Sequence, residues 1–219
     1  MYAYEATLRI ENHLSFRTYE YGNTVITSRV LHNWALRFAL NGIRGDPEKD
    51  HLENLSGKPI YATPAIPLDV DYVFTTFHPF PEAPYLLTNP NRLTPGSVKS
   101  YQTRFTILHY KEEVQVGSRF RFAIASTEPL RKEMVITYGG KQTLQRVFLE
   151  PAEITDPIDI KNAIRHPINP LDFPEDIYLK NIFQYTLPPS PLYVGNVVGS
   201  FKGRIIRKNA KQYVIPPSW

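Results

Sequence analysis

The chain has 219 residues, of which 42% are hydrophobic and 21% are charged, a globular composition that excludes a disordered tail, a collagen and a coiled coil. Its 25 Lys and Arg residues against 21 Asp and Glu give a net charge of +4, which favours a polyanionic partner without requiring one. It has no cysteine, which excludes disulfides, thiolate zinc sites and cysteine nucleophiles. No segment resembles a signal peptide or the ~18 apolar residues of a membrane span, so we expect a soluble, cytoplasmic protein.

The charge is unevenly distributed along the chain. Residues 1–98 sum to −2, 99–146 to +5, 147–198 to −4 and 199–219 to +5. Two basic segments separated by an acidic one predict a cationic face for a polyanion and an acidic face for a protein partner, if folding brings the basic segments together. The alternative is a solvated surface on which charges cluster by chance.

The first elements are a strand and a helix. Residues 2–10 alternate between apolar and polar, the period of a half-buried strand. Apolar residues then recur at helical spacing from 31 to 38, between Ser28 and Asn41-Gly42, and predict a helix over 29–40. The opposite stripe of this helix holds Arg29, Asn33 and Arg37. Because no carboxylate occurs between Glu20 and Asp46, we expect these arginines to lack a local partner.

The rest of the chain is mostly strand-like. Residues 59–98 hold eight prolines and several aromatics and predict a long insertion within a single domain of residues 1–219. A second helix is expected to start at Pro174 and end before Pro188. The order of elements predicts an α+β fold, an antiparallel sheet with helices on one face. Strands are expected at 104–110, 119–125, 192–207 and 213–215, with a hairpin of 134–138 and 142–149 through Gly139-Gly140-Lys141.

Two patterns are compatible with binding of a phosphate backbone. Arg119 and Arg121 share one face of a strand whose other face carries Phe120 and Phe122, although solvent-facing arginines on an ordinary sheet give the same alternation. Three glycines, at 195, 199 and 203, share a face if the segment is one strand. That face would accept either a packed helix or, beside Lys202 and Arg204, a phosphate backbone.

Enzyme motifs are scarce. The sequence lacks the G-x-S-x-G, G-x-x-x-x-G-K-[ST], G-x-G-x-x-G and H-E-x-x-H patterns, so hydrolase, P-loop, dinucleotide and zincin activities have no support. We expect no cofactor and no metal site. One tight group, His109-Tyr110-Lys111, would suit metal-independent RNA cleavage, with histidine moving protons and lysine stabilising the charged phosphorane. Structural or binding roles for these three residues are the alternative.

Four segments together resemble a known family. They are Tyr2-Ala3-Tyr4-Glu5-Ala6-Thr7-Leu8, Leu31-His32-Asn33-Trp34-Ala35-Leu36, Gly117-Ser118-Arg119-Phe120-Arg121-Phe122 and Tyr138-Gly139-Gly140-Lys141. These segments are similar to the Csc-one-type, Cas-five-like subunit of type I-D CRISPR Cascade complexes. The resemblance covers residues 2 to about 149, and none of its motifs is a catalytic signature.

The resemblance implies a ferredoxin-like, RRM-like RAMP fold with a protruding thumb. It also implies a non-catalytic subunit that caps the 5′ handle of the crRNA and contacts the backbone and large subunits, with contact to target DNA near the PAM left open. The alternative function is a metal-independent endoribonuclease that cuts CRISPR repeat RNA. We expect Tyr101 to stack a base and the following cations to neutralise handle phosphates: Arg29, Arg37, Lys99, Arg104, Arg119, Arg121 and Lys141.

Overall fold

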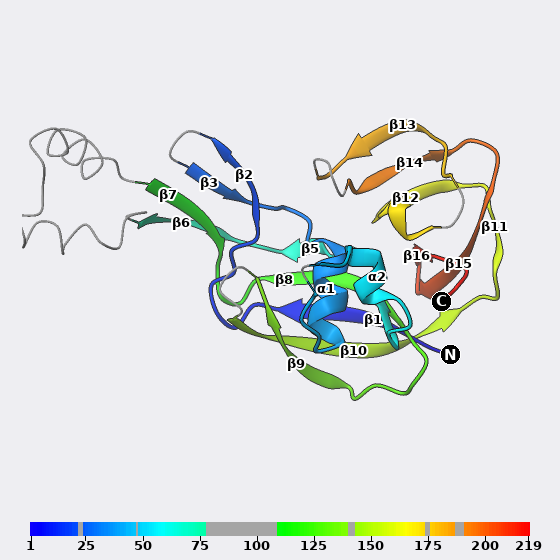
Figure 1. Cartoon of the computed structure of the whole chain (residues 1–219), viewed down its shortest axis with the longest axis horizontal. Helices are drawn as coiled ribbons and strands as arrows, with labels where there is room; N and C mark the ends of the chain where they lie inside the picture. The colour runs from blue at the N-terminus through cyan, green and yellow to red at the C-terminus, as the bar shows by residue number, and fades with distance from the viewer. Residues whose placement is uncertain (22–23, 47, 78–108, 140–142, 174–175, 187–190) are drawn as a thin grey trace, which may run out of the picture.

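A curled, antiparallel sheet forms the centre of the protein (Figure 1). The computed structural model describes all residues except 22–23, 47, 78–108, 140–142, 174–175 and 187–190. Within the described residues the sheet has nine strands in the order β11-β15-β10-β1-β8-β4, with β16 beside β15, β9 beside β10 and β5 beside β8. Their bounds are β1 Tyr2–Arg9, β4 Ile60–Ala62, β5 Ile66–Asp69, β8 Arg119–Ser126, β9 Glu133–Tyr138, β10 Thr143–Ile154, β11 Ile158–Ile160, β15 Phe201–Lys208 and β16 Lys211–Ile215.

Strand β1 lies in the middle of this sheet and confirms the predicted first strand. It pairs antiparallel with β8 on one side and with β10 on the other. Tyr4, Ala6 and Leu8 are buried in the main core together with Phe120 and Phe122 of β8. The intervening residues of each strand therefore point to the opposite face of the sheet, as the period-two alternation predicted.

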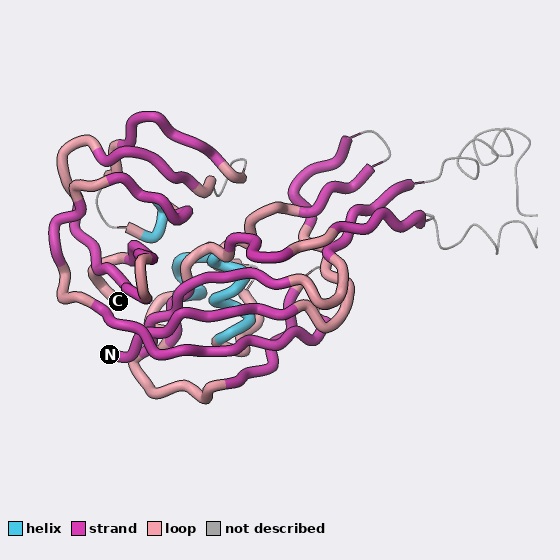
Figure 2. The backbone as a smooth tube through the Cα atoms, turned by 180° about the vertical axis from the view of Figure 1, so that it is seen from behind, coloured by secondary structure: helices cyan, strands magenta, loops and turns pink. Residues whose placement is uncertain are grey.

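Two short helices, α1 (Asn33–Leu40) and α2 (His51–Leu55), lie on one side of the central strands (Figures 1 and 2). Helix α1 buries Leu36 and Leu40 in the main core. It begins four residues later than the sequence predicted, because the backbone of Leu31 makes a β-bridge to Ala65 through two hydrogen bonds of 2.9 Å. His32 then caps the helix, its Nδ1 accepting from the Trp34 amide. Arg29 consequently precedes the helix and shares no helical face with Arg37.

Two smaller sheets extend from opposite ends of the central sheet (Figures 1 and 2). An arm of four strands has the order β2-β3-β7-β6, in which β3 and β7 run parallel. A three-stranded sheet has the order β12-β14-β13. The bounds are β2 Arg17–Tyr21, β3 Thr24–Thr27, β6 Tyr72–Phe77, β7 His109–Val114, β12 Ala163–Ile168, β13 Leu179–Gln184 and β14 Tyr193–Val197.

The predicted insertion at 59–98 is divided between these parts. Strands β4 and β5 pair with β8 in the central sheet, and β6 belongs to the arm. Residues 78–98, the remainder of that stretch, lie outside the described residues. The hairpin of β9 and β10 is confirmed by their antiparallel register, from Thr143 opposite Tyr138 onwards.

Two predictions for the C-terminal third are wrong. The second helix is absent from the described residues between 176 and 186, where β13 pairs antiparallel with β14 instead. The three glycines do not share a face, because a turn at Gly199 separates β14 from β15. A Cβ at Gly195 would lie 3.0 Å from the Lys180 carbonyl oxygen, and one at Gly203 would lie 3.1 Å from that of Ile215. Neighbouring strands therefore occupy the space that a helix or an RNA backbone was predicted to use.

Three ion pairs join the acidic and basic segments of the C-terminal third. Carboxylates from residues 147–198 pair with cations of β15, at 2.8 Å for Asp159 with Lys202 and 3.5 Å for Glu150 with Lys208. Asp156 lies 3.7 Å from Arg204. Three cations of the basic tail thus pair with the acidic segment, whereas Lys211 pairs with Glu5 of β1. Among the helices that the structure describes, none is long and apolar enough to cross a membrane.

Candidate nucleic-acid interface

The face of the central sheet that carries no helix presents arginines on three neighbouring strands. Arg119 of β8 lies opposite Arg9 of β1, which lies opposite Arg146 of β10. In the next row Arg121 lies opposite Thr7, which lies opposite Phe148. Paired residues on adjacent strands point to the same face, so these side chains form one surface.

Three of these arginines are already paired with carboxylates. Arg119 lies 3.0 Å from Asp69, and Arg9 lies 2.6 Å from Glu11. Arg146 also contacts Glu11, at 3.2 Å, and Glu133. Ion pairs this exposed are worth about 0 to 1 kcal/mol, so a phosphate can replace the carboxylate at small cost.

Arg121 lies in a groove of about 620 Å³ between β8, β12 and β16. Arg165 of β12 and Lys211 of β16 line the same groove. Neither Arg121 nor Arg165 has a side-chain hydrogen bond or ion pair to any residue that the structure describes, and the Nε of Arg121 is buried without a partner. Two guanidinium groups without carboxylates in one groove make a site suited to phosphate oxygens.

One carboxylate enters this part of the structure. Glu5 of β1 lies 3.1 Å from the Nζ of Lys211 and accepts a 2.5 Å hydrogen bond from the Tyr213 hydroxyl. Both oxygens of the Glu5 carboxylate are therefore engaged by Lys211 and Tyr213. The charges of Arg121 and Arg165 are left uncompensated. Tyr213 stays protonated, because burial and then the hydrogen bond to Glu5 raise the pKa of its hydroxyl.

The groove is backed by a buried neutral histidine. Burial lowers the pKa of His166 to about 4, the Pro64 carbonyl opposes that shift, and the positive charge of Arg121 adds to it. The Nε2 of His166 lies 2.7 Å from the Pro64 oxygen and 3.1 Å from the Thr63 hydroxyl. The ring joins β12 to the connection that follows β4, so it positions the strand that carries Arg165.

Protonation of His166 predicts a pH-dependent stability. The folded-state pKa of about 4 lies below the ordinary value of 6.5, so as the pH falls the unfolded chain takes up the proton first. The stability present above pH 6.5 is therefore lost towards pH 4, by about 3 kcal/mol over the whole window. Urea titrations across this window measure the loss. H166Q, which retains a donor for the Pro64 carbonyl, should flatten the profile, and an unchanged profile in H166Q would contradict this role.

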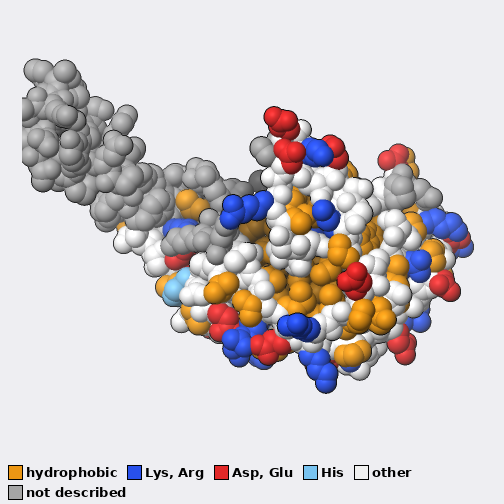
Figure 3. All heavy atoms as spheres, turned by 60° about the horizontal axis from the view of Figure 1, so that its bottom comes forward, with side chains coloured by type: hydrophobic (Ala, Val, Ile, Leu, Met, Phe, Trp, Pro, Cys, Tyr) orange, Lys and Arg blue, Asp and Glu red, His pale blue; other side chains and the backbone are white. Residues whose placement is uncertain are grey.

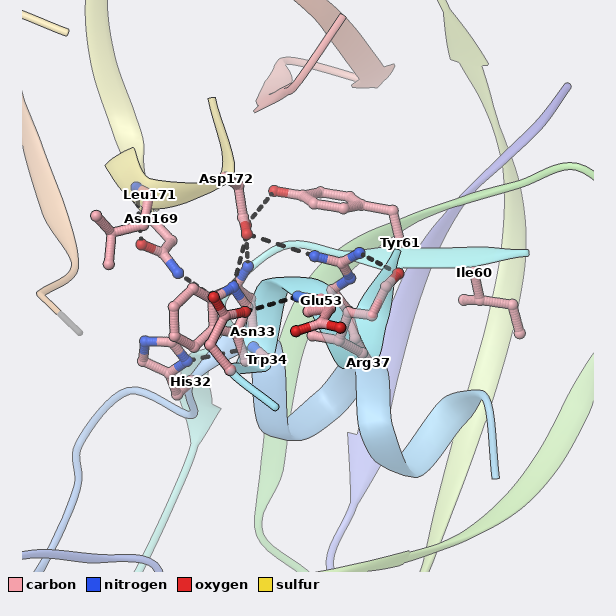
Figure 4. Close-up of polar contacts among 12 residues, drawn as sticks. His32, Asn33, Trp34, Arg37, Glu53, Ile60, Tyr61, Asn169, Leu171 and Asp172 are labelled. Carbon is pink, nitrogen blue, oxygen red and sulfur yellow. Dashed lines mark hydrogen bonds and ion pairs between the residues drawn. The ribbon is translucent and has the colours of Figure 1, made fainter. Parts of the chain in front are cut away.

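Arg37, which the sequence predicted to bind RNA, lies away from this face of the sheet and is buried against Asp172. Its side chain is only 5% exposed and lies 3.4 Å from Asp172, which follows β12 in a 3-10 turn at Pro170–Asp172 (Figure 4). Asp172 also accepts hydrogen bonds from Asn33 at 2.5 Å, Trp34 Nε1 at 2.6 Å and the Tyr61 hydroxyl at 3.1 Å. Burial raises the pKa of Asp172, and Arg37 with these donors acts in the opposite direction. The polar side of α1 thus attaches the C-terminal third to the helices.

Arg29 lies at the arm. Its Nη2 is 2.7 Å from Glu112, whose side chain is only 4% exposed, and its guanidinium stacks over the Tyr72 ring at 3.8 Å. Glu112 is buried, so breaking its ion pair with Arg29 costs more free energy than breaking the exposed pairs of Arg119, Arg9 and Arg146. Arg29 is therefore less available to a phosphate than those three arginines.

Four of the predicted RNA-binding residues fall in the ranges 78–108 and 140–142 of the chain, which the structure does not describe. They are Lys99, Tyr101, Arg104 and Lys141. Of the candidate catalytic group, Tyr110 is 44% exposed, and Lys111 lies 3.0 Å from Glu113. That ion pair reduces the availability of the lysine for stabilising a phosphorane. The side chain of His109 is not described.

Sequence reasoning missed Arg165 and Phe148. The alternation of Ile164, Arg165 and His166 was the available signal for an exposed arginine on a strand, but the acidic surroundings along the chain hid it. The cations do not form a single patch on the face shown in Figure 3, where Lys and Arg alternate with Asp and Glu. Among the described residues no group of three or more His, Asp or Glu could hold a metal ion.

Chains of two cryo-EM structures each cover 90% of this chain and 86% of their own length: type III-B Cmr-beta bound to cognate target RNA and AMPPnP, and Cmr-beta bound to cognate target RNA. They have 8% and 10% identity and TM-scores of 0.43 and 0.37, too low to support a fold assignment. No curated protein matches the sequence. Residues 1–217 match the family described as type I-D CRISPR-associated protein Cas5/Csc1, and the chain belongs to that family.

Proposed function

We propose that this chain is a non-catalytic, RNA-binding subunit of a type I-D CRISPR effector complex in the cytoplasm, which caps the 5′ handle of the crRNA and contacts the backbone and large subunits. Membership of the Cas5/Csc1 family supports the assignment to that system. The observation that carries the RNA-binding role is the groove in which Arg121 and Arg165 lack carboxylate partners among the described residues.

The proposed path of the RNA follows the helix-free face of the central sheet. The phosphates of one stretch occupy the groove, and the next stretch passes over Arg119, Arg9 and Arg146. Single-stranded RNA suits such a path, because its backbone can follow a curved surface and its bases are free of a duplex. As the strand binds, Arg119 and Arg146 exchange their exposed carboxylate partners, Asp69 and Glu133, for phosphates.

We further propose that the core of the chain has the ferredoxin-like fold of RAMP proteins. A ferredoxin-like, RAMP-type core is supported by β1 between β8 and β10, with α1 packed on one face and the other face covered in part by β15 and β16. The arm of β2, β3, β6 and β7 leads into residues 78–108 and has the place of the thumb that the resemblance implies.

Purification with the neighbouring subunits tests the function. We expect the assembled complex to retain crRNA whose 5′ end derives from the CRISPR repeat, and we expect that end to be lost to nuclease when this chain is omitted. Sequencing of the bound RNA from both preparations is the measurement. An equally protected 5′ end without this chain would contradict the capping role.

The endoribonuclease alternative has its own test. We expect repeat RNA incubated with the purified chain in EDTA to remain intact, because Lys111 is paired with Glu113. Gel analysis of the RNA reads the outcome. Cleavage that H109A abolishes would overturn the non-catalytic assignment.

A further inference from the structure

The aromatic ring of Phe148 lies among the arginines of the helix-free face. Phe148 is partly exposed on β10, between Val147 and Leu149, which point into the main core. Arg146, two residues earlier on the same strand, shares its face. The guanidinium of Arg9 lies 5.5 Å from the centre of the Phe148 ring.

The pairing register relates this ring to the groove. Thr7 of β1 lies opposite Phe148 on one side and opposite Arg121 on the other. Two strand spacings separate Arg121 from Phe148, a distance of about 10 Å between their backbones. The threonine between them is small, so both longer side chains can rise above it.

This spacing fits one nucleotide of a single strand. We infer that Phe148 stacks a base of the RNA strand whose phosphates occupy the groove, and that the base takes the place of the Arg9 guanidinium over the ring, with Arg146 beside it. The inference rests on the proposed function and adds a base contact to its phosphate contacts. Stacking accepts any base, since every base has a flat face, so Phe148 contributes affinity without reading sequence.

The surroundings of the ring favour RNA as the ligand. Phe148 is flanked by two guanidinium groups, and its cross-strand neighbours on this face are the polar Thr7 of β1 and Glu133 of β9. The exposed apolar side chains of this face on β9 and β10, Val135 and Leu144, lie beside and beyond Arg146, so they do not adjoin the ring directly. A protein partner would gain most from a contiguous apolar surface. A nucleotide uses both kinds of group, with the ring beneath its base and the arginines beside its phosphates.

The experiment compares variants of the full chain in binding a fluorescent single-stranded copy of the CRISPR repeat RNA over a salt series. F148L keeps an apolar side chain at this position but removes the flat ring, and F148Y keeps the ring. We expect F148L to weaken binding about 5- to 150-fold, equivalent to about 1 to 3 kcal/mol, and F148Y to bind like the unaltered chain. The slope of affinity against salt should be unchanged in both, because no phosphate contact is removed.

A matched control uses a ring elsewhere. Phe74 is 60% exposed on the arm, so F74L removes an exposed ring that the inferred path does not touch, and its affinity should be unchanged. Normal RNA affinity in F148L would overturn the inference while leaving the proposed function intact. Absence of RNA binding by the unaltered chain would instead refute the proposed function itself, and the inference with it.

Discussion

Replacing Arg121 and Arg165 together by glutamate is expected to weaken RNA binding about 100-fold or more. Each guanidinium has no carboxylate partner among the described residues, so its whole charge is available to a phosphate. A hydrogen bond to a charged group contributes about 1.5 to 3 kcal/mol of binding free energy. The free energies of two such bonds add, so losing both lowers the affinity by about 100-fold or more. Charge reversal adds repulsion to the loss.

The salt dependence separates a local effect from a general one. Loss of two phosphate contacts should reduce the slope of log affinity against log salt by about 1.4, because each contact to a single strand contributes about 0.7. The control is R131E with K132E, which makes the same change in net charge on exposed residues outside the groove. Equal losses in both double variants would show that net charge alone governs binding, and that the groove has no special role.

Replacing Asp172 by alanine is expected to destabilise the protein by about 3 to 5 kcal/mol. Arg37 would then be a buried charge without its counter-ion, and three other donors would lose their acceptor. Removing one partner of a buried ion pair costs this much because the remaining charge stays out of water. Urea denaturation measures the change. Since Asp172 also joins β12 to α1, the variant should weaken RNA binding by misplacing Arg165.

A second variant identifies the cause of that loss. With Arg37 and Asp172 both replaced by leucine, no uncompensated charge remains, so the double variant should be more stable than D172A. A stability of D172A within about 1 kcal/mol of the unaltered protein would show that Arg37 finds water or another partner, and would contradict the account of this cluster.

The central strands could be predicted from the sequence because half-buried strands alternate with period two. Strand β1, strand β8 and the hairpin of β9 and β10 follow that pattern. The start of α1 could not be predicted, because Leu31 pairs with Ala65 far along the chain. Pro174-Glu175-Asp176 is a strong local signal for a helix start, but it says nothing of the pairing with β14 that makes residues 179–184 a strand.

Ion-pair partners in the candidate site likewise come from distant parts of the chain, so the sequence does not predict them. The gap without carboxylates from Glu20 to Asp46 predicted a free Arg37, but its counter-ion Asp172 comes from the other end of the chain. Arg121 could be predicted because its alternation with Phe120 and Phe122 fixes its face. Its companion Arg165 could not, since the groove is made by strands that meet only in the folded protein.

Photocrosslinking of RNA to the assembled complex, with the linked peptides identified by mass spectrometry, tests the central claim most directly. If the RNA strand follows the groove and the helix-free face, the linked peptides will be those that carry Arg121, Phe148 and Arg165. Crosslinks confined to the opposite face, on the peptides of α1 and α2, would contradict it.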